Sequence, residues 1–513
     1  MWSVTNSFDG RREIAYANFS SSSRVKRSGM EIIMEFLKGK ELQKRIHEDD
    51  ALRERYFVDY TRRYFTKHHD KILAIGGLRG TGKTTGLLQS LKGLDAVYLC
   101  AGKEDTVTGN DYIKILKNVE EKYIVIDEYS WIKDRKELDY FLFTCIQNGK
   151  RIAITGTESI TLEFLNYGNL IHRIEMIHVT LLSYDEYLHV FNYPHSADNC
   201  DKYLIEGGIF GKYVINNYES MMYYIKVAII DNLVDYFSSI YSTYDEQLIR
   251  QAVYSILYEA ICSSTISRLP LYKVNHAPLD NYLDVFDIDT AVEYPKGKFR
   301  QAVRRVSEIL EQIGVIVIVK NAVMDFMSED DYDYIDNLNI EKTPKYKTYI
   351  VNPSLTCQLI MAVYNLQDID NYVLGNVYKA CVMSYLAFYK ESNDKLYFID
   401  FTGKSGKNFE LDALMVKGID ERYLYLFECK HKLSAKVQKK NTIVSQSLAD
   451  FLEERFPNSE IDGKCYVYPG EPQVVEYEGE DFLSKSSRIP PPQHFQYRWG
   501  MNAFLCKLLD IFY

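Results

Sequence analysis

Short apolar runs alternate with amphipathic segments over residues 67–190. This alternation predicts strands joined by helices, and therefore an α/β fold with a mainly parallel sheet. The expected strands are residues 71–76, 96–100, 123–127, 151–155 and 176–180. From Met30 to about Phe65 the apolar residues have helical spacing, and they follow a serine-rich basic tract. Residues 1–66 are therefore predicted to form an arm and helices.

A glycine-rich turn follows the first expected strand. Residues 77–84 read Gly-Leu-Arg-Gly-Thr-Gly-Lys-Thr and fit the phosphate-loop pattern GxxxxGK[ST]. Glycines let backbone N–H groups close around phosphates, and the helix N-terminus adds partial positive charge. We expect Lys83 to act catalytically on the outer phosphates and the Thr84 hydroxyl to ligate Mg²⁺. The residues expected to contact ATP are Gly77, Leu78, Arg79, Gly80, Thr81, Gly82, Lys83, Thr84 and Thr85. The alternative is a glycine turn that binds no ligand.

A second motif has the form of a Walker B segment. The apolar residues 123–126 lead into Asp127 and Glu128. Asp127 can hold Mg²⁺ through water, and Glu128 can orient or deprotonate the attacking water. A later strand ends in Thr155-Gly-Thr157, and the hydroxyls of Thr155 and Thr157 could sense the terminal phosphate, although threonine is also an ordinary turn residue. An acidic strand end that faces solvent is the alternative for the carboxylates. Together the two motifs predict a nucleotide-hydrolysing domain with ATP and Mg²⁺ as cofactors.

Composition limits the class of protein. With 513 residues, 46% of them hydrophobic, the chain can fold into about three or four domains. The net charge of −10 argues against a chain that coats nucleic acid by bulk electrostatics. Nine cysteines without metal-ligand spacing favour a reduced, cytoplasmic protein. No apolar run approaches the length of a membrane span, so no membrane contact is expected.

The middle of the chain carries two further predicted regions. Residues 191–268 have helical spacing and are expected to form a helical lid. Residues 269–356 read as a winged helix, with a helix at 299–313 and strands at 315–319 and 346–351. The start of this helix is basic, which suits phosphate contact, but the tip between the strands is acidic and the DNA backbone would repel it. The winged helix is therefore either a DNA reader or a packing and hinge module.

Residues 370–513 carry a different set of charged side chains. In a hairpin of two alternating segments, Asp412 would lie opposite Glu428, and Glu410 opposite Lys430. All four side chains would then project from one face. Asp412 and Glu428 could hold Mg²⁺, and Lys430 could orient a hydrolytic water, so these three are the candidate catalytic residues. The arrangement D…ExK is typical of restriction-endonuclease-like domains, and the alternative is an exposed salt-bridged hairpin.

These motifs together resemble a family of prokaryotic AAA-like ATPases. In that family a P-loop ATPase domain precedes a winged helix and an α/β restriction-endonuclease-like domain. Besides the nucleotide motifs, the resemblance is carried by residues 171–174, 181–187, 203–208 and 346–353. It implies that Arg173 acts on the nucleotide. The chain departs from the family at Lys379, where members often carry a glutamate on the first helix of the nuclease-like domain, and a lysine there repels a cation.

The sequence therefore predicts an ATPase coupled to a nuclease-like domain that hydrolyses phosphodiester bonds with Mg²⁺. Nucleic acid is the expected partner. The chain could also form a homo-oligomer. The competing hypothesis is an ATP-driven regulatory switch whose nuclease-like domain is inactive and serves binding.

Overall fold

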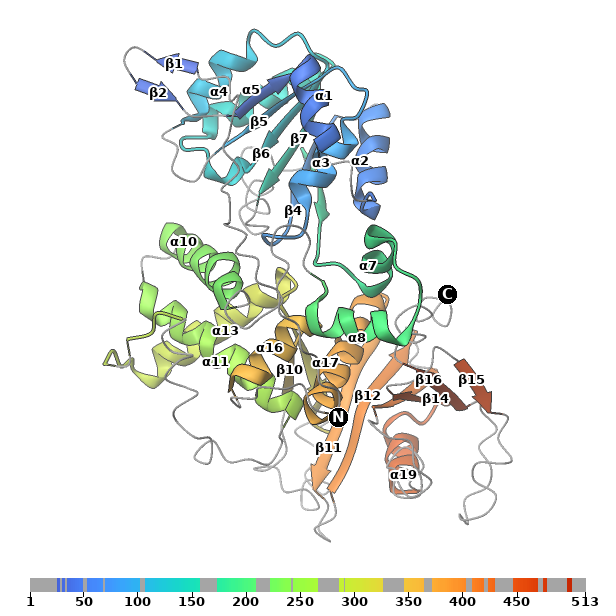
Figure 1. Ribbon diagram of the computed structural model, residues 1–513. Helices are drawn as coiled ribbons and strands as arrows, with labels where there is room; N and C mark the ends of the chain where they lie inside the picture. The colour runs from blue at the N-terminus through green and yellow to red at the C-terminus, as the bar shows by residue number, and fades with distance from the viewer. Residues whose placement is uncertain are drawn as a thin grey trace, which may run out of the picture.

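Two α/β bodies make up the protein in this computed structural model (Figure 1). The structure describes residues 25–27, 30–32, 35–48, 53–67, 70–101, 107–156, 173–208, 222–240, 243–265, 286–289, 291–325, 346–363, 371–402, 408–418, 423–429, 446–468, 474–477 and 496–500. The upper body in Figure 1 contains the glycine-rich loop, and the lower body contains a second sheet with helices packed on it.

A six-stranded sheet of order β3-β5-β6-β7-β4-β8 forms the centre of the upper body. All its strands except β3 run parallel. The strands are β3 (Glu35–Lys38), β4 (Ile72–Gly76), β5 (Ala96–Cys100), β6 (Tyr123–Asp127), β7 (Arg151–Gly156) and β8 (Ile174–His178). Their apolar runs are buried, as in parallel sheets that are covered on both faces. The predicted α/β fold with a mainly parallel sheet is confirmed.

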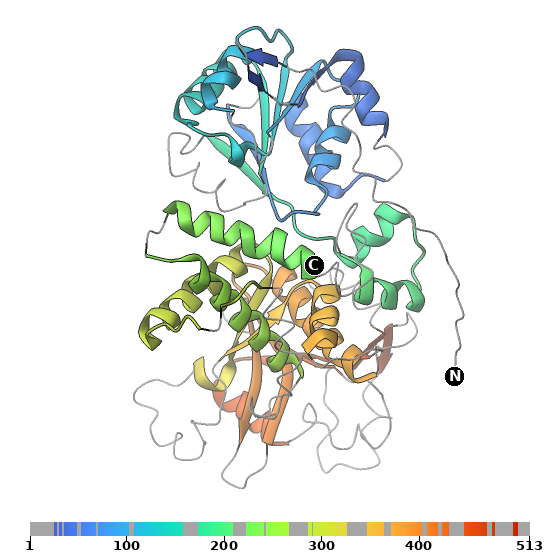
Figure 2. The ribbon, with the colours of Figure 1, turned by 60° about the vertical axis from the view of Figure 1, so that its left-hand side comes forward.

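Helices cover both faces of this sheet (Figure 2). On one face lie α1 (Gly39–Glu48), α2 (Tyr56–Thr66) and α3 (Lys83–Ser90), and on the other lie α4 (Gly109–Leu116) and α5 (Lys136–Gln147). A short 3-10 helix, η1 (Tyr129–Trp131), follows β6.

The prediction that a helix extends from Met30 to Phe65 is wrong at its start. Residues 25–38 contain the strands β1 (Val25–Arg27), β2 (Met30–Ile32) and β3. β3 pairs antiparallel with the edge strand β5, from Glu35 opposite Cys100 to Lys38 opposite Val97. Pairing with a strand distant in the sequence overrides the local helical spacing here.

Helices follow the first body, as the sequence predicts. They are α7 (Tyr184–Phe191), α8 (Ala197–Glu206), the π-helix η2 (Ile225–Ile230), α10 (Asp231–Ile240) and α11 (Glu246–Thr265). α7 lies between the two bodies in Figure 1. Within the described part of the chain, none of the helices combines the length and apolar character needed to cross a membrane.

An eight-stranded mixed sheet of order β10-β9-β11-β12-β13-β14-β16-β15 forms the lower body. The strands are β9 (Ile316–Asn321), β10 (Tyr346–Ile350), β11 (Lys395–Thr402), β12 (Asn408–Lys417), β13 (Tyr423–Cys429), β14 (Glu460–Tyr468), β15 (Val474–Tyr477) and β16 (Gln496–Gly500). One face packs against α11, α13 (Lys296–Gln312), α16 (Pro353–Val363) and α17 (Asn371–Tyr389). The other face packs against α14 (Ala322–Asp325) and α19 (Gln446–Arg455).

The helix and the two strands expected of a winged helix are present as α13, β9 and β10, and the two strands pair antiparallel. β9 also pairs in parallel with β11, through Lys320 opposite Tyr397 and Asn321 opposite Phe398. The β9–β10 hairpin is therefore the edge of the C-terminal sheet. The acidic tip after Asp325 lies outside the described residues.

Candidate nucleotide site and acidic cluster

The loop between β4 and α3 follows a path that only glycine can take at several positions. Gly77, Gly80 and Gly82 have φ angles of 153°, 73° and 78°, which other residues rarely adopt. A Cβ atom on Gly77 would also lie 2.2 Å from the carbonyl oxygen of Val179. α3 begins at Lys83, so the free N–H groups of its first turn lie at the end of the loop.

Lys83 folds back onto its own loop and is almost fully buried. Its ammonium donates hydrogen bonds to the carbonyl oxygens of Gly77 and Leu78, each at 2.8 Å. Burial lowers the pKa of Lys83 to about 8, although the negative charges of Glu128 and Asp127 oppose this shift. The ammonium can exchange carbonyl oxygens for phosphate oxygens, which are stronger partners.

The two expected magnesium ligands lie together. The Thr84 hydroxyl donates to Oδ2 of Asp127 at 2.7 Å. Asp127 ends β6 and is 1% exposed. Its carboxylate also accepts hydrogen bonds from the hydroxyls of Tyr98, at 2.8 Å, and Thr155. Thr155 therefore orients Asp127 in this state, and Thr157 lies outside the described residues.

Glu128 adopts a left-handed conformation with φ 54°. Its N–H donates to the Thr155 hydroxyl at 3.1 Å and to Oδ1 of Asp127 at 3.1 Å. For a residue with a side chain this conformation costs about 1–2 kcal/mol, and strained positions of this kind cluster at functional sites. The charge of Glu128 acts on Lys83, so both expected catalytic groups lie in one electrostatic environment.

Two expected arginines pack on aromatic rings. The guanidinium of Arg79 lies 5.0 Å from the centre of the Trp131 ring. That of Arg173 lies 3.8 Å from the centre of the Phe143 ring, on α5. The remaining expected contact residues follow the loop and the start of α3: Leu78, Gly80, Thr81 and Thr85.

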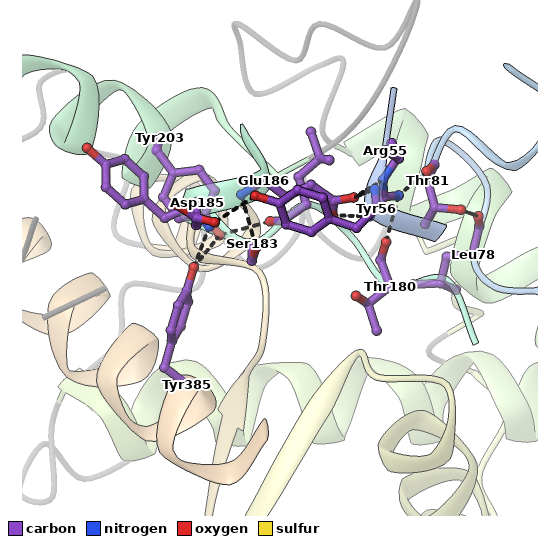
Figure 3. A network of polar contacts seen from close by, with 12 residues as sticks. Arg55, Tyr56, Leu78, Thr81, Thr180, Ser183, Asp185, Glu186, Tyr203 and Tyr385 are labelled. Carbon is purple, nitrogen blue, oxygen red and sulfur yellow. Dashed lines mark hydrogen bonds and ion pairs between the residues drawn. The ribbon is translucent and has the colours of Figure 1, made fainter. Parts of the chain in front are cut away.

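The sequence reasoning missed Tyr98 and Arg55, which both touch this site. Tyr98 lies on β5, and burial beside Asp127 raises the pKa of its phenol well above the ordinary value, so it stays a hydrogen-bond donor. Arg55 precedes α2 and donates to the carbonyl oxygen of Thr81 (Figure 3). The position of Tyr98 within β5, the strand next to β6, was the available signal for this residue. The local sequence around Arg55 carried no such signal.

The predicted hairpin forms from β12 and β13. Ala413 lies opposite Phe427 at the end of the described register, so the expected pairing of Asp412 with Glu428 stays a prediction. The N–H of Cys429 donates to Oδ2 of Asp412 at 2.7 Å. Lys430, the expected catalytic lysine, lies outside the described residues.

A β-bulge changes the direction of Asp412. Against β11, Leu414 lies opposite Tyr397 but Leu411 lies opposite Ile399. Asp412 and Ala413 together therefore oppose the single residue between those two partners. A bulge of this kind re-aims a side chain relative to the regular alternation.

The bulge separates the two expected metal ligands. Asp412 reaches Lys379 on α17, with 2.5 Å between the ammonium and Oδ1. Phe427 and Cys429 pack in the core on the α17 side, so alternation along β13 directs Glu428 to the other face. The expectation that both carboxylates project from one face is wrong, because regular alternation was assumed for β12.

Lysines neutralise the carboxylates on the α17 side. Lys379 also lies 2.9 Å from Glu410. Lys347 lies 3.0 Å from Asp400 and 3.5 Å from Glu410. Burial alone would lower the pKa of Lys379, but Asp412 and Glu410 raise it well above its usual range, so the ammonium stays charged.

This acidic cluster (Asp400, Glu410 and Asp412) does not fit Mg²⁺ in the described arrangement. A metal ion needs carboxylate oxygens that lysine ammonium groups already bind here. Among the described residues there is no group of three histidine, cysteine, aspartate or glutamate side chains that could hold a metal ion. The nucleotide site, by contrast, offers the hydroxyl, carboxylate and lysine that a magnesium–triphosphate complex requires.

The comparisons with known proteins are of three kinds. No curated protein matches the chain. Similar solved structures include the Holliday junction branch migration motor RuvB of Thermotoga maritima, at 13% identity over 58% of this chain and 95% of that chain, with a TM-score of 0.24. The S. cerevisiae Hsp104:casein complex is 14% identical over 40% of this chain and 37% of that chain, with a TM-score of 0.24. PCH-2 of C. elegans is 12% identical over 53% of this chain and 75% of that chain, with a TM-score of 0.22.

The chain matches only part of each Hsp104 chain: 37% in the casein complex and 51% in the S. cerevisiae Hsp104-ADP complex. A family model described as an AAA domain matches residues 69–188. These residues contain the glycine-rich loop, the acidic end of β6 and the parallel strands β4 to β8. Residues 69–188 are an AAA-family domain of the α/β P-loop type.

Proposed function

We propose that the protein binds and hydrolyses ATP at the loop between β4 and α3. The observation that carries this proposal is the 2.7 Å hydrogen bond between Thr84 and Asp127 at the end of that loop. It brings the hydroxyl at the start of α3 and the carboxylate at the end of β6 to the place where phosphates would lie. The AAA-family match of residues 69–188 supports the same activity.

Each group has a defined role in this proposal. Lys83 leaves the carbonyl oxygens of Gly77 and Leu78 and pairs with the outer phosphates, which offsets their negative charge. Thr84 and Asp127 would hold Mg²⁺, which when bound neutralises charge on the phosphates. Glu128 accepts a proton from the attacking water or orients it.

The test compares ATP binding and phosphate release, with Mg²⁺, in wild type and three variants. Lys83→Ala and Asp127→Asn should each lower turnover by about 100-fold or more. Lys114→Ala is the matched control, because this lysine is mostly exposed on the same body and should leave turnover unchanged. A wild-type protein that binds neither ATP nor GTP with a divalent cation would refute the proposal.

We further propose that the C-terminal body is a binding or regulatory module whose acidic cluster does not cut in the described state. The pairing of Lys379 with Asp412 and Glu410 supports this, as does the opposite direction of Glu428. Nucleic acid is the proposed partner class, on the resemblance of the chain to nuclease-like domains. The competing hypothesis of Mg²⁺-dependent phosphodiester hydrolysis requires Lys379 to leave Asp412.

A cleavage assay separates the two hypotheses. Single-stranded and double-stranded DNA and RNA are incubated with Mg²⁺ or Mn²⁺, with and without ATP. The binding module predicts intact substrates while ATP turnover continues. Cleavage by wild type that disappears in Asp412→Ala would establish a nuclease instead.

A further inference from the structure

We propose that Arg55 is a positioning residue of the phosphate loop, which it holds ready for nucleotide from a buried ion pair with Glu186. This inference rests on the ATP site proposed above. Arg55 lies directly before α2 and is 4% exposed. Its guanidinium group connects the loop, at Thr81, to α7, at Glu186 (Figure 3).

Arg55 holds three parts of the chain with one guanidinium group. One nitrogen, Nη1, donates to the carbonyl oxygens of Thr81, in the loop, and of Thr180, after β8, the latter at 3.0 Å. The other two nitrogens form a bidentate pair with Glu186, at 2.9 Å from Nε and 2.5 Å from Nη2. A planar fork that satisfies both partners at once has little freedom to move.

The contact with Thr81 sets the direction of the next peptide group. In a trans peptide the carbonyl of Thr81 and the N–H of Gly82 point in opposite directions. Because Arg55 binds this carbonyl, the Gly82 N–H is directed away from Arg55 and is left available as a donor to phosphate. A cation on the carbonyl also polarises the peptide and strengthens its N–H as a donor.

The segment after β8 is fixed by the same side chain. Thr180 follows Val179, whose carbonyl oxygen is the atom that excludes a side chain at Gly77. By binding both Thr81 and Thr180, Arg55 ties the loop to the segment that follows β8. Such preorganisation reduces the ordering that a nucleotide would otherwise have to impose.

Glu186 is itself held rigidly. It lies in the first turn of α7, which Ser183 caps by accepting the Glu186 N–H at 3.3 Å. Its carboxylate also accepts the N–H of Tyr56 at 3.0 Å. The N–H of Tyr184 donates to the hydroxyl of Tyr385 on α17, so α7 is anchored to the lower body as well (Figure 3).

A purely structural role for Arg55 is the competing explanation, and the chain offers a matched control for it. Arg250 on α11 is 6% exposed and pairs with Asp231 at 3.1 Å and Glu246 at 2.6 Å. These partners lie in the helical region and not in the loop. Replacing either arginine removes a buried cation from its acidic partners, but only Arg55 contacts the proposed nucleotide site.

The experiment measures ATP affinity with Mg²⁺ in Arg55→Gln, Arg55→Lys and Arg250→Gln, at a temperature where circular dichroism shows each variant fully folded. We expect Arg55→Gln to weaken binding about 10- to 100-fold, since a charge-assisted hydrogen bond is lost. Arg55→Lys should recover part of the loss, because it keeps the charge without the fork. Arg250→Gln should lower the melting temperature and bind ATP as wild type does.

Two results would overturn the positioning role: folded Arg55→Gln that binds ATP as tightly as wild type, or an equal loss of affinity in Arg250→Gln. If Arg55→Gln does not fold, Glu186→Gln takes its place, since it keeps the shape of the carboxylate and removes the charge that holds Arg55. Wild-type affinity in Glu186→Gln would then count against the proposal. Absence of ATP binding by wild type refutes the nucleotide site itself, so the two failures are distinguishable.

Discussion

The ammonium of Lys379 lies 2.5 Å from a carboxylate oxygen of Asp412, on opposite sides of the interface between α17 and the C-terminal sheet. The pair is mostly buried, with side chains 14% and 8% exposed. A cation supplied by the chain therefore takes the position beside Asp412 that a divalent ion would need. The two hypotheses for the C-terminal body differ in whether this contact must break, and this can be tested directly.

Lys379→Met should destabilise the protein and make its melting temperature depend on Mn²⁺. Removing one partner of a buried ion pair costs about 3–5 kcal/mol in the free energy of unfolding. Millimolar Mn²⁺, without nucleotide, should restore part of the melting temperature of this variant but leave wild type unchanged. The double variant with Asp412→Asn is the control, because it lacks the uncompensated carboxylate and should gain nothing from Mn²⁺. Equal Mn²⁺ effects on wild type and Lys379→Met would contradict this account.

ATP affinity should fall in alkaline solution because of Lys83. In the free protein burial lowers the pKa of this lysine to about 8, and bound phosphates would raise it again. Above that pH the protein must take up a proton on binding, so affinity should drop about tenfold between pH 7 and pH 9. Isothermal titration across this range measures the effect. Lys83→Arg stays charged and should give a flat profile, and the same slope in that variant would exclude Lys83 as the source.

Tyr98→Phe should raise the Mg²⁺ concentration that half-saturates ATP hydrolysis. The Tyr98 hydroxyl donates to Oδ2 of Asp127 at 2.8 Å, the oxygen that Thr84 also contacts. Losing one hydrogen bond of about 1 kcal/mol corresponds to roughly a fivefold increase. Tyr129→Phe is the matched control, since this buried hydroxyl donates to Asp139 instead, at 2.6 Å. An equal shift in both variants would show a general packing effect.

Gly208→Ala should destabilise the junction between α8 and the lower body more than backbone strain alone explains. Gly208 has φ 93°, and a Cβ there would lie 2.2 Å from Nδ2 of Asn352. Asn352 cannot turn away freely, because its Oδ1 accepts hydrogen bonds from Ser354 and Leu355. Gly93 has φ 76° with nothing within 4 Å of its Cβ position.

Gly93→Ala therefore isolates the cost of the left-handed backbone, about 1–2 kcal/mol. We expect the steric contact to add about 1–3 kcal/mol in Gly208→Ala, measured by urea denaturation of both variants. Equal losses would mean that Asn352 moves aside at no cost.

The sequence was sufficient to predict those parts of the site in which a motif directly follows a strand. The loop at residues 77–84 and the acid pair at residues 127–128 each combine a motif with the strand that precedes it. Strand ends of a parallel sheet meet at one edge, so the contact between Thr84 and Asp127 could be expected without a structure. The antiparallel pairing of β12 with β13 followed from the period-two alternation of both segments.

Other features depend on contacts between residues far apart in the sequence. Arg55 and Glu186 are separated by 131 positions, and nothing in either segment identifies the other. The sequence singled out Lys379 by its charge, but its partners became evident only when α17 packed on β12. No glycine or proline near Asp412 indicates the bulge in the sequence. Residues 35–38 form a strand because β5 has an open edge beside them, which local spacing does not reveal.

The parallel pairing of β9 with β11 has a consequence for how this protein can be divided. A fragment that ends between α16 and α17 would leave one side of β9 with unsatisfied backbone groups, and such an open strand invites pairing with other molecules. A fragment that starts there would lose two strands and expose β11 in the same way. Dissection of the protein should therefore retain the lower body from α13 onward as one piece, because shorter pieces are expected to aggregate.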